Sequence, residues 1–204
     1  MNIIYLLFHG LSPYSGISKK ILHQVKGFEA CGHRVSLCTY SIADNGHRVR
    51  MINNEIIEDY GTGKPAAAKR RVSYQCIYRY AITHQVELIY VRSFHNANPF
   101  TIRLFSKLRK AGIKIAMEIP TYPYDSEYAG FPLVTRLGIQ VDKVFRKTLA
   151  KHVNAIVTFS DYHCIFGQRT IQISNGVDFD SIPLKKTVSK NTSVIHLLGV
   201  AEVH

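Results

Sequence analysis

The segment that starts at residue 118 combines side chains that suit a sugar-like ligand. It begins with Glu118 at the end of an apolar run, and a proline-rich stretch then brings Tyr122, Tyr124 and Asp125 close together in the sequence. A carboxylate accepts hydrogen bonds from hydroxyl groups, and it acts as a general base where burial raises its pKa. Aromatic rings and carboxylates together suit the faces and hydroxyls of sugars. The alternatives are that Glu118 bonds to the backbone of its own loop and that the tyrosines pack on one another.

Two other polar loops are candidates for ligand binding. Gly16 ends the segment Ser12-Pro13-Tyr14-Ser15-Gly16, in which Ser15 is predicted to cap a helix. Backbone N–H groups at a helix amino terminus, approached without a Cβ, suit an anion. The alternative for Gly16 is a tight strand-to-helix turn. His95 follows another apolar run, and it is either a ligand contact or a loop histidine that is exposed or bonded to backbone.

Alternating strand-like and helix-like segments are predicted to position these loops. Apolar runs of strand length alternate with amphipathic runs of helix length, a pattern typical of an α/β fold in which helices cover both faces of a mostly parallel sheet. We therefore expect a Rossmann-like three-layer domain with ligand loops at the carboxyl edge of its sheet. The predicted strands are 1–8, 35–40, 87–91, 114–118, 155–159 and 170–173, with a hairpin at 48–59, and the predicted helices are 16–30, 66–84, 99–110 and 133–151, with a short helix from 160.

The predicted helix 133–151 has an apolar face and a basic face. The apolar face carries Leu133, Leu137, Val141, Val144, Thr148 and Leu149, and the basic face carries Arg136, Lys143, Lys147 and Lys151. We expect the apolar face to meet the core. The basic face then either attracts an anionic membrane surface or a polyprenyl-diphosphate sugar, or is an ordinary solvated surface.

Composition and motif content narrow the class of protein. The formal net charge of +12 favours anionic partners. A nucleic-acid partner is not expected, because the basic residues are spread over several helices and no nucleic-acid-binding motif is present. The histidines form no paired metal-ligand motif, and no glycine fingerprint for a dinucleotide follows the first strand. Scattered cysteines and the lack of a signal peptide indicate a cytoplasmic protein.

Four short segments of the chain are similar to segments of one enzyme family. The most specific is Ile173-Ser174-Asn175-Gly176-Val177-Asp178, and the weaker ones are the loop ending at Gly16, Glu29-Ala30-Cys31-Gly32-His33-Arg34-Val35 and Val157-Thr158-Phe159-Ser160. On these segments the chain resembles the amino-terminal domain of a family 4 glycosyltransferase, an enzyme with the two-Rossmann-domain GT-B architecture. The similarity extends over nearly the whole chain.

The resemblance implies a retaining enzyme that transfers a sugar from a nucleotide-sugar donor to a glycan or a polyprenyl-linked acceptor, in polysaccharide or glycoconjugate biosynthesis. It implies no metal and no cofactor other than the donor. Glu118 is the predicted catalytic residue, although many relatives have a histidine there and a carboxylate cannot do the work of an imidazole unchanged. The residues predicted to bind substrate are Gly16, His95, Tyr122, Asp125, Ser160, Asn175 and Gly176.

The same resemblance predicts how the chain is divided. We expect an acceptor-binding domain at residues 1–182, a linker at 183–192 and the start of a nucleotide-sugar-binding domain at 193–204. Most donor contacts would then lie beyond His204, and the isolated chain would be inactive. The expected partners are the donor, the acceptor and an anionic membrane surface on the inner face of the plasma membrane. The alternative is a non-catalytic α/β module that binds an acceptor or a membrane.

Overall fold

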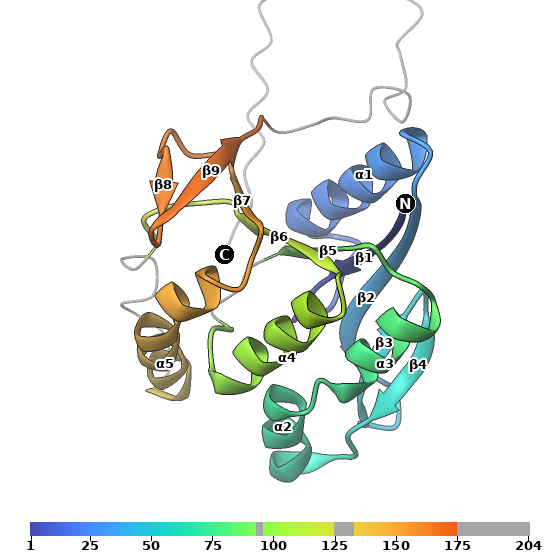
Figure 1. The fold of residues 1–204 in the computed structure, drawn as a ribbon. Coiled ribbons are helices and arrows are strands. Elements are labelled where there is room, and N and C mark those ends of the chain that lie inside the picture. The colour runs from blue at the N-terminus through green and yellow to red at the C-terminus, as the bar shows by residue number, and fades with distance from the viewer. Residues whose placement is uncertain (93–95, 125–132, 175–204) are drawn as a thin grey trace, which may run out of the picture.

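The described part of the chain is built on a nine-stranded sheet (Figure 1). A computed structural model describes residues 1–92, 96–124 and 133–174. The strand order is β4-β3-β2-β1-β5-β6-β7-β9-β8; the pairs from β2 to β9 are parallel, and β3, β4 and β8 pair antiparallel. The strands are β1 (Asn2–Leu6), β2 (Arg34–Ile42), β3 (Arg48–Ile52), β4 (Glu55–Asp59), β5 (Leu88–Arg92), β6 (Lys114–Ile119), β7 (Ala155–Thr158), β8 (Cys164–Ile165) and β9 (Gln168–Gln172).

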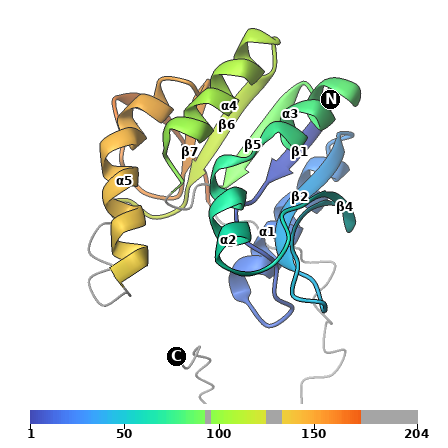
Figure 2. The ribbon, with the colours of Figure 1, turned by 90° about the horizontal axis from the view of Figure 1, so that it is seen from below.

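Helices cover both faces of this sheet (Figures 1 and 2). On one face α1 (Gly16–Ala30) packs Ile21 against Ile3, Tyr5 and Leu7 of the β1 segment. The opposite face carries the larger core and the helices α2 (Gly63–Val72), α3 (Gln75–Thr83), α4 (Pro99–Lys110) and α5 (Leu133–Ala150). Successive strand side chains point to opposite faces, so β1 supplies both cores. The predicted α/β fold of Rossmann-like, three-layer type is confirmed.

Several boundaries follow from local chemistry that is visible in the sequence. The predicted limits of α4 are confirmed, and a capping box explains its start: the Asn98 side chain accepts from Thr101 N at 3.1 Å, and Thr101 Oγ1 accepts from Asn98 N at 3.0 Å. The predicted limits of α1 are also confirmed, and the chain leaves this helix through Gly32, whose φ is +78°. The predicted hairpin at 48–59 is confirmed as β3 and β4.

Three local predictions are wrong. The single helix predicted at 66–84 is two helices, because Ser73 is extended (φ −99°, ψ 107°) and lets the ring of Tyr74 enter the core. The short helix predicted from residue 160 is replaced by the β8–β9 hairpin, which turns at Phe166 and Gly167 with φ of 51° and 82°. Ser15 occupies the N-cap position of α1, but its side chain makes no capping hydrogen bond.

The orientation of α5 also differs from the expectation. Leu149 is buried as expected, but most of the predicted core face is exposed, namely Leu133, Leu137, Val141 and Val144. The rest of the buried side is formed by Ile139, Asp142 and Ala150. The helical period identifies two stripes on α5, but it does not determine which of them meets the sheet. Asp142 tolerates burial because its carboxylate accepts hydrogen bonds from Ala97 N at 2.9 Å and from Tyr124 Oη at 3.3 Å.

Part of the predicted organisation lies outside the described residues. The predicted linker at 183–192 and the predicted second-domain segment at 193–204 belong there, so the division into domains stays a prediction. Within the described ranges, every helix is too short or too polar to cross a bilayer.

Candidate functional site

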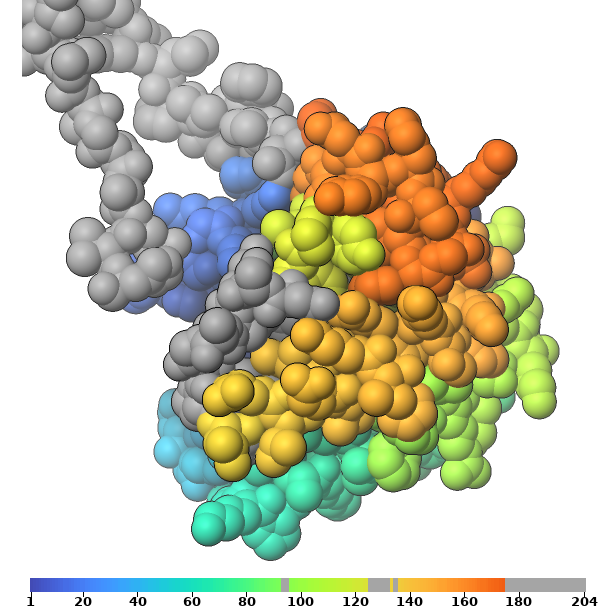
Figure 3. Space-filling model, turned by 90° about the vertical axis from the view of Figure 1, so that its left-hand side faces the viewer, coloured from blue at the N-terminus to red at the C-terminus, as the bar shows by residue number. Residues whose placement is uncertain are grey.

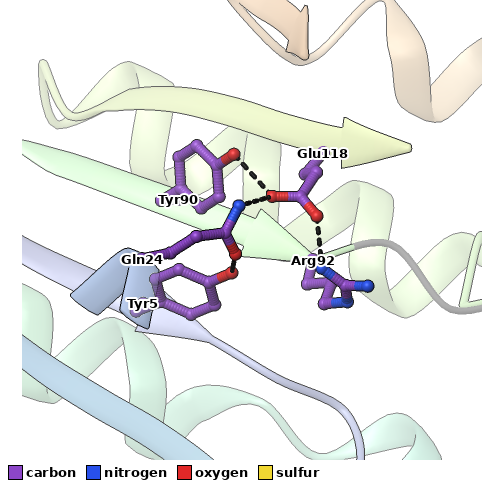
Figure 4. Close-up of polar contacts among 5 residues, drawn as sticks. All are labelled: Tyr5, Gln24, Tyr90, Arg92 and Glu118. Carbon is purple, nitrogen blue, oxygen red and sulfur yellow. Dashed lines mark hydrogen bonds and ion pairs between the residues drawn. The ribbon is translucent and has the colours of Figure 1, made fainter. Parts of the chain in front are cut away.

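Glu118 lies at the centre of a buried polar network near the carboxyl edge of the sheet (Figure 4). It is the penultimate residue of β6, and its register partner is Arg92, the last residue of β5. Arg92 forms an ion pair with Oε1 of Glu118 through Nη1, and Tyr90 donates its hydroxyl to Oε2 at 2.6 Å. The side chain of Glu118 is fully buried. Both carboxylate oxygens are therefore bonded to protein groups, as a buried charge requires.

Helix α1 is tied into the same network. Gln24 donates from Nε2 to Oε2 of Glu118 at 2.8 Å, and its Oε1 accepts from the hydroxyl of Tyr5 at 2.5 Å. Figure 4 shows these side chains converging from α1 and from β1, β5 and β6. The network thus fixes the position of α1 relative to three adjacent strands, in addition to the apolar contacts of that face.

The negative charge of Glu118 acts on both tyrosines. Burial raises the pKa of Tyr90, and the nearby Glu118 carboxylate raises it further, partly offset by Arg92. The pKa of Tyr5 is raised for the same reasons, burial first and Glu118 second. Both phenols therefore remain protonated donors at neutral pH, which keeps the network intact.

The ammonium group of Lys20 lies on α1 between this network and the amino terminus of the helix. Lys20 has a lowered pKa, caused first by partial burial and then by the charge of Arg92, while Glu118 opposes the shift. Its ammonium group also lies 4.0 Å from the ring centroid of Phe159, the residue after β7. Gly16, Lys20 and Gln24 are spaced four residues apart on α1, so they form one stripe from the helix start to Glu118. This stripe presents positive charge and first-turn N–H groups together, which suits an anion.

The space around Gly16 is open. A Cβ built on Gly16 would meet no described atom within 4 Å, and its φ is not in the left-handed region. The fold of the described residues therefore does not require glycine at this position. Gly10 differs, since a Cβ there would lie 2.9 Å from the carbonyl oxygen of Tyr40. Gly10 is thus explained by packing against β2, and Gly16 is not explained by packing.

Two other predicted site residues, Tyr122 and Ser160, are brought into contact. The loop after β6 donates from Tyr122 N to Oγ of Ser160 at 3.1 Å. The ring of Tyr122 packs edge-to-face on Tyr124, Tyr162 and Phe166, with centroids 6.4, 5.0 and 5.5 Å away. These contacts agree with the alternative in which the tyrosines pack on one another.

The other predicted site residues are His95, Asp125, Asn175 and Gly176, and they lie outside the described residues. Their roles stay predictions. In the ranges that are described, no three His, Cys, Asp or Glu side chains are grouped to hold a metal ion.

Comparisons with models of protein families, with curated proteins and with solved structures found no match for this chain. The resemblance to family 4 glycosyltransferases therefore depends on its sequence segments alone.

The network includes four residues that sequence reasoning missed as site residues, namely Tyr5, Gln24, Tyr90 and Arg92. A usable signal existed for three of them, because polar atoms on Tyr5, Tyr90 and Arg92 interrupt apolar strand runs and each needs a partner if buried. The sequence does not show which group these side chains bond to, since Arg92 and Glu118 meet only through the pairing of β5 with β6. Gln24 carried a weaker signal, its spacing of eight residues from Gly16.

Proposed function

We propose that this chain is the acceptor-side domain of a family 4-like glycosyltransferase, which acts together with a nucleotide-sugar-binding domain. The single observation that supports this most is the stripe of Gly16, Lys20 and Gln24 that ends on the Arg92–Glu118 pair at the carboxyl edge of a parallel sheet. Ligands of open α/β sheets bind at that edge. In this proposal the start of α1 and the Lys20 ammonium group face the diphosphate of the donor.

The transfer step requires positioned charge rather than a protein nucleophile. The acceptor hydroxyl attacks the anomeric carbon from the face that the diphosphate leaves, the bond from that carbon to the phosphate oxygen breaks, and the hydroxyl proton passes to a phosphate oxygen. Lys20 and the first-turn N–H groups of α1 stabilise the negative charge that develops on the diphosphate. We assign Glu118 a positioning role, because its two oxygens are already engaged by Arg92, Tyr90 and Gln24.

A pair of glycine variants tests the proposed donor contact. Gly16 and Gly27 lie in the same helix, and a Cβ at either position meets no described atom within 4 Å. Both Gly→Ala changes should leave folding intact or raise stability by about 0.5–1 kcal/mol, since alanine favours a helix. The natural full-length protein would be assayed with UDP-glucose, UDP-N-acetylglucosamine and GDP-mannose as donors and host membranes as the acceptor source. We expect Gly16→Ala to lower transfer at least ten-fold and Gly27→Ala to leave it unchanged.

A second pair, Lys20→Met and Lys19→Met, separates donor binding from folding. Lys19 is the exposed neighbour of Lys20 and serves as its matched control. We expect KM for the nucleotide sugar to rise about ten-fold in Lys20→Met, which is the loss of about 1.4 kcal/mol of binding, and to stay constant in Lys19→Met. Equal behaviour of the two members of each pair would contradict the proposed site. Acceptor or membrane binding with no transfer from any donor would support the non-catalytic module instead.

A further inference from the structure

The outward side of α5 carries a continuous apolar stripe. Four aliphatic side chains on it are exposed: Leu133 (72%), Leu137 (58%), Val141 (44%) and Val144 (71%). Their spacing of four, four and three residues places them in one row along the helix. Figure 3 shows α5, in gold, at the surface beside the orange β8–β9 hairpin, to which Gln168 joins it by donating to the carbonyl of Ala150 at 3.1 Å. Single exposed aliphatic residues are common, but an aligned row of four marks a contact surface.

The exposed charges that α5 itself and Lys151 place beside this stripe have one sign. Arg136 and Lys147 are exposed on the outward side of the helix next to the stripe, and Lys151 is exposed just after the helix ends. The one carboxylate of α5 is Asp142, which is 3% exposed and accepts hydrogen bonds from Ala97 N and Tyr124 Oη. The outward face of α5 therefore offers aliphatic groups and cations without an acidic group.

We propose that this face of α5 docks on an anionic lipid surface. A helix that lies flat at a bilayer surface buries an apolar row at the boundary of the head groups and acyl chains, while its cations contact anionic head groups. The four aliphatic residues and the flanking cations of α5 match both requirements. The overall charge of +12 adds long-range attraction to the same surface.

A second copy of this chain fits the face less well. A two-fold contact between two α5 helices would bring Arg136 and Lys147 of one copy toward the same cations of the other, and like charges oppose each other at an interface. An anionic bilayer instead complements these cations and accepts the aliphatic row. Charge complementarity thus selects the lipid surface as the occupant.

Single-tryptophan variants provide a direct test, because the sequence of this chain contains no Trp. Val144→Trp places a probe in the stripe, and Ile56→Trp places one at a comparably exposed aliphatic residue of β4, 57% exposed. Each purified chain would be mixed with vesicles of phosphatidylcholine alone or with one third phosphatidylglycerol. We expect a blue shift of the emission for Val144→Trp only, and only with phosphatidylglycerol. A shift of both probes, or of neither, would overturn the proposed docking face.

Sedimentation with the same vesicles measures the contribution of each group. We expect Leu137→Ser with Val144→Ser to lower the partition coefficient on phosphatidylglycerol vesicles at least ten-fold, and Arg136→Gln with Lys147→Gln to lower it roughly 25-fold, or about five-fold per cation. The matched controls are Ile56→Ser with Ile82→Ser, at exposed aliphatic residues on β4 and α3, and Lys110→Gln with Lys114→Gln, at exposed lysines. Unchanged thermal unfolding and circular dichroism establish that each variant is folded.

Two results would contradict the inference. One is equal binding of the stripe variants and their controls, which would indicate attraction by net charge alone. The other is a dimer in light scattering that Leu137→Ser with Val144→Ser dissociates, without vesicle binding by the parent chain, because a second copy would then cover the stripe. The vesicle measurements need no nucleotide sugar, so failure of the transferase proposal and failure of this one are distinguishable.

Discussion

Two buried arginines of this fold are stabilised in different ways. Arg92, 6% exposed at the end of β5, forms an ion pair with the fully buried Glu118. Arg50, 1% exposed on β3, has no carboxylate within ion-pair distance among the described residues. It donates from Nη1 to the carbonyl oxygen of Leu7 at 2.8 Å, and its guanidinium lies 5.8 Å from the ring centroid of Phe8.

Two titratable groups next to Arg50, the Cys38 thiol and the Tyr60 hydroxyl, are neutral at physiological pH. Burial raises the pKa of the Cys38 thiol to about 12, although Arg50 pulls it down. Burial likewise raises the pKa of the Tyr60 hydroxyl, again opposed by Arg50. Arg50 is therefore balanced by dipoles and a ring, and Arg92 by a full charge. The two sites should respond differently to loss of the arginine, since only one of them leaves a charge behind.

The largest expected effect is that of Arg92→Met. Removing the guanidinium leaves the Glu118 carboxylate buried without its counter-charge, and breaking a buried pair in this way costs about 3–5 kcal/mol. Urea unfolding would measure the loss. The control is Arg79→Met, which removes an exposed arginine from its 3.7 Å pair with the partly buried Glu58 and should cost less than about 1 kcal/mol.

A double variant sharpens this prediction. In the Arg92→Met background, Glu118→Gln removes the uncompensated charge but keeps the shape of the side chain, so part of the lost stability should return. Two results would contradict it. One is that Arg92→Met lowers the free energy of unfolding no more than Arg79→Met does, and the other is that adding Glu118→Gln lowers it again by as much as Arg92→Met did. In either case the Arg92–Glu118 pair is not what compensates the buried charge.

A smaller effect is expected for Arg50→Met. This change leaves the carbonyl oxygen of Leu7 without its donor, but it leaves no buried charge, so it should cost about 1–3 kcal/mol. The measurement is the same urea unfolding, and Arg79→Met again provides the surface reference. A loss larger than that of Arg92→Met would reverse the comparison and would point to an anionic partner of Arg50 outside the described residues.

The sequence predicted the fold better than it predicted these contacts, for a physical reason. The limits of α1 and α4 depend on residues near their ends, such as Gly32 and the Asn98–Thr101 capping box, and such local signals can be read directly. The pair of Arg92 with Glu118 depends on strand register between residues 26 positions apart. Sequence periodicity predicts that β5 and β6 exist, but it does not predict which side chains meet across them.

The outward face of α5 shows the same limit in another form. The row that contains Leu137 and Val144 and the side that contains Ile139 are both apolar, and of the predicted core face only Leu149 is buried, so hydropathy alone did not identify the buried side. The buried carboxylate of Asp142 decides the matter in the structure, through donors on two other segments, Ala97 and Tyr124. A charged residue on the buried stripe is acceptable only once those donors are in place, and they come from the tertiary fold.

The smallest expected effect is a change in the alkaline pH dependence of stability. Below a pH of about 10, tyrosines are protonated in both the folded and the unfolded chain, and the contribution of Tyr90 is fully present. Above it the unfolded chain releases a proton that folded Tyr90 keeps, because burial and the Glu118 charge raise its pKa. The free energy of unfolding should therefore fall as the pH rises past about 10, with a slope that approaches about 1.4 kcal/mol per pH unit for each such tyrosine.

Tyr90→Phe tests whether the Glu118 network causes this slope. The variant removes one proton difference between the two states, so its loss of stability between about pH 10 and 11 should be shallower than that of the parent chain, by a difference that approaches one proton as the pH rises. Tyr14→Phe, at a side chain that is 92% exposed, is the matched control. Equal slopes for Tyr90→Phe and the parent would mean that Tyr90 ionises alike in the folded and unfolded chain. Glu118 would then not hold the phenol proton, and the contrast with Arg50, which has no carboxylate within ion-pair distance among the described residues, would rest on the ion pair with Arg92 alone.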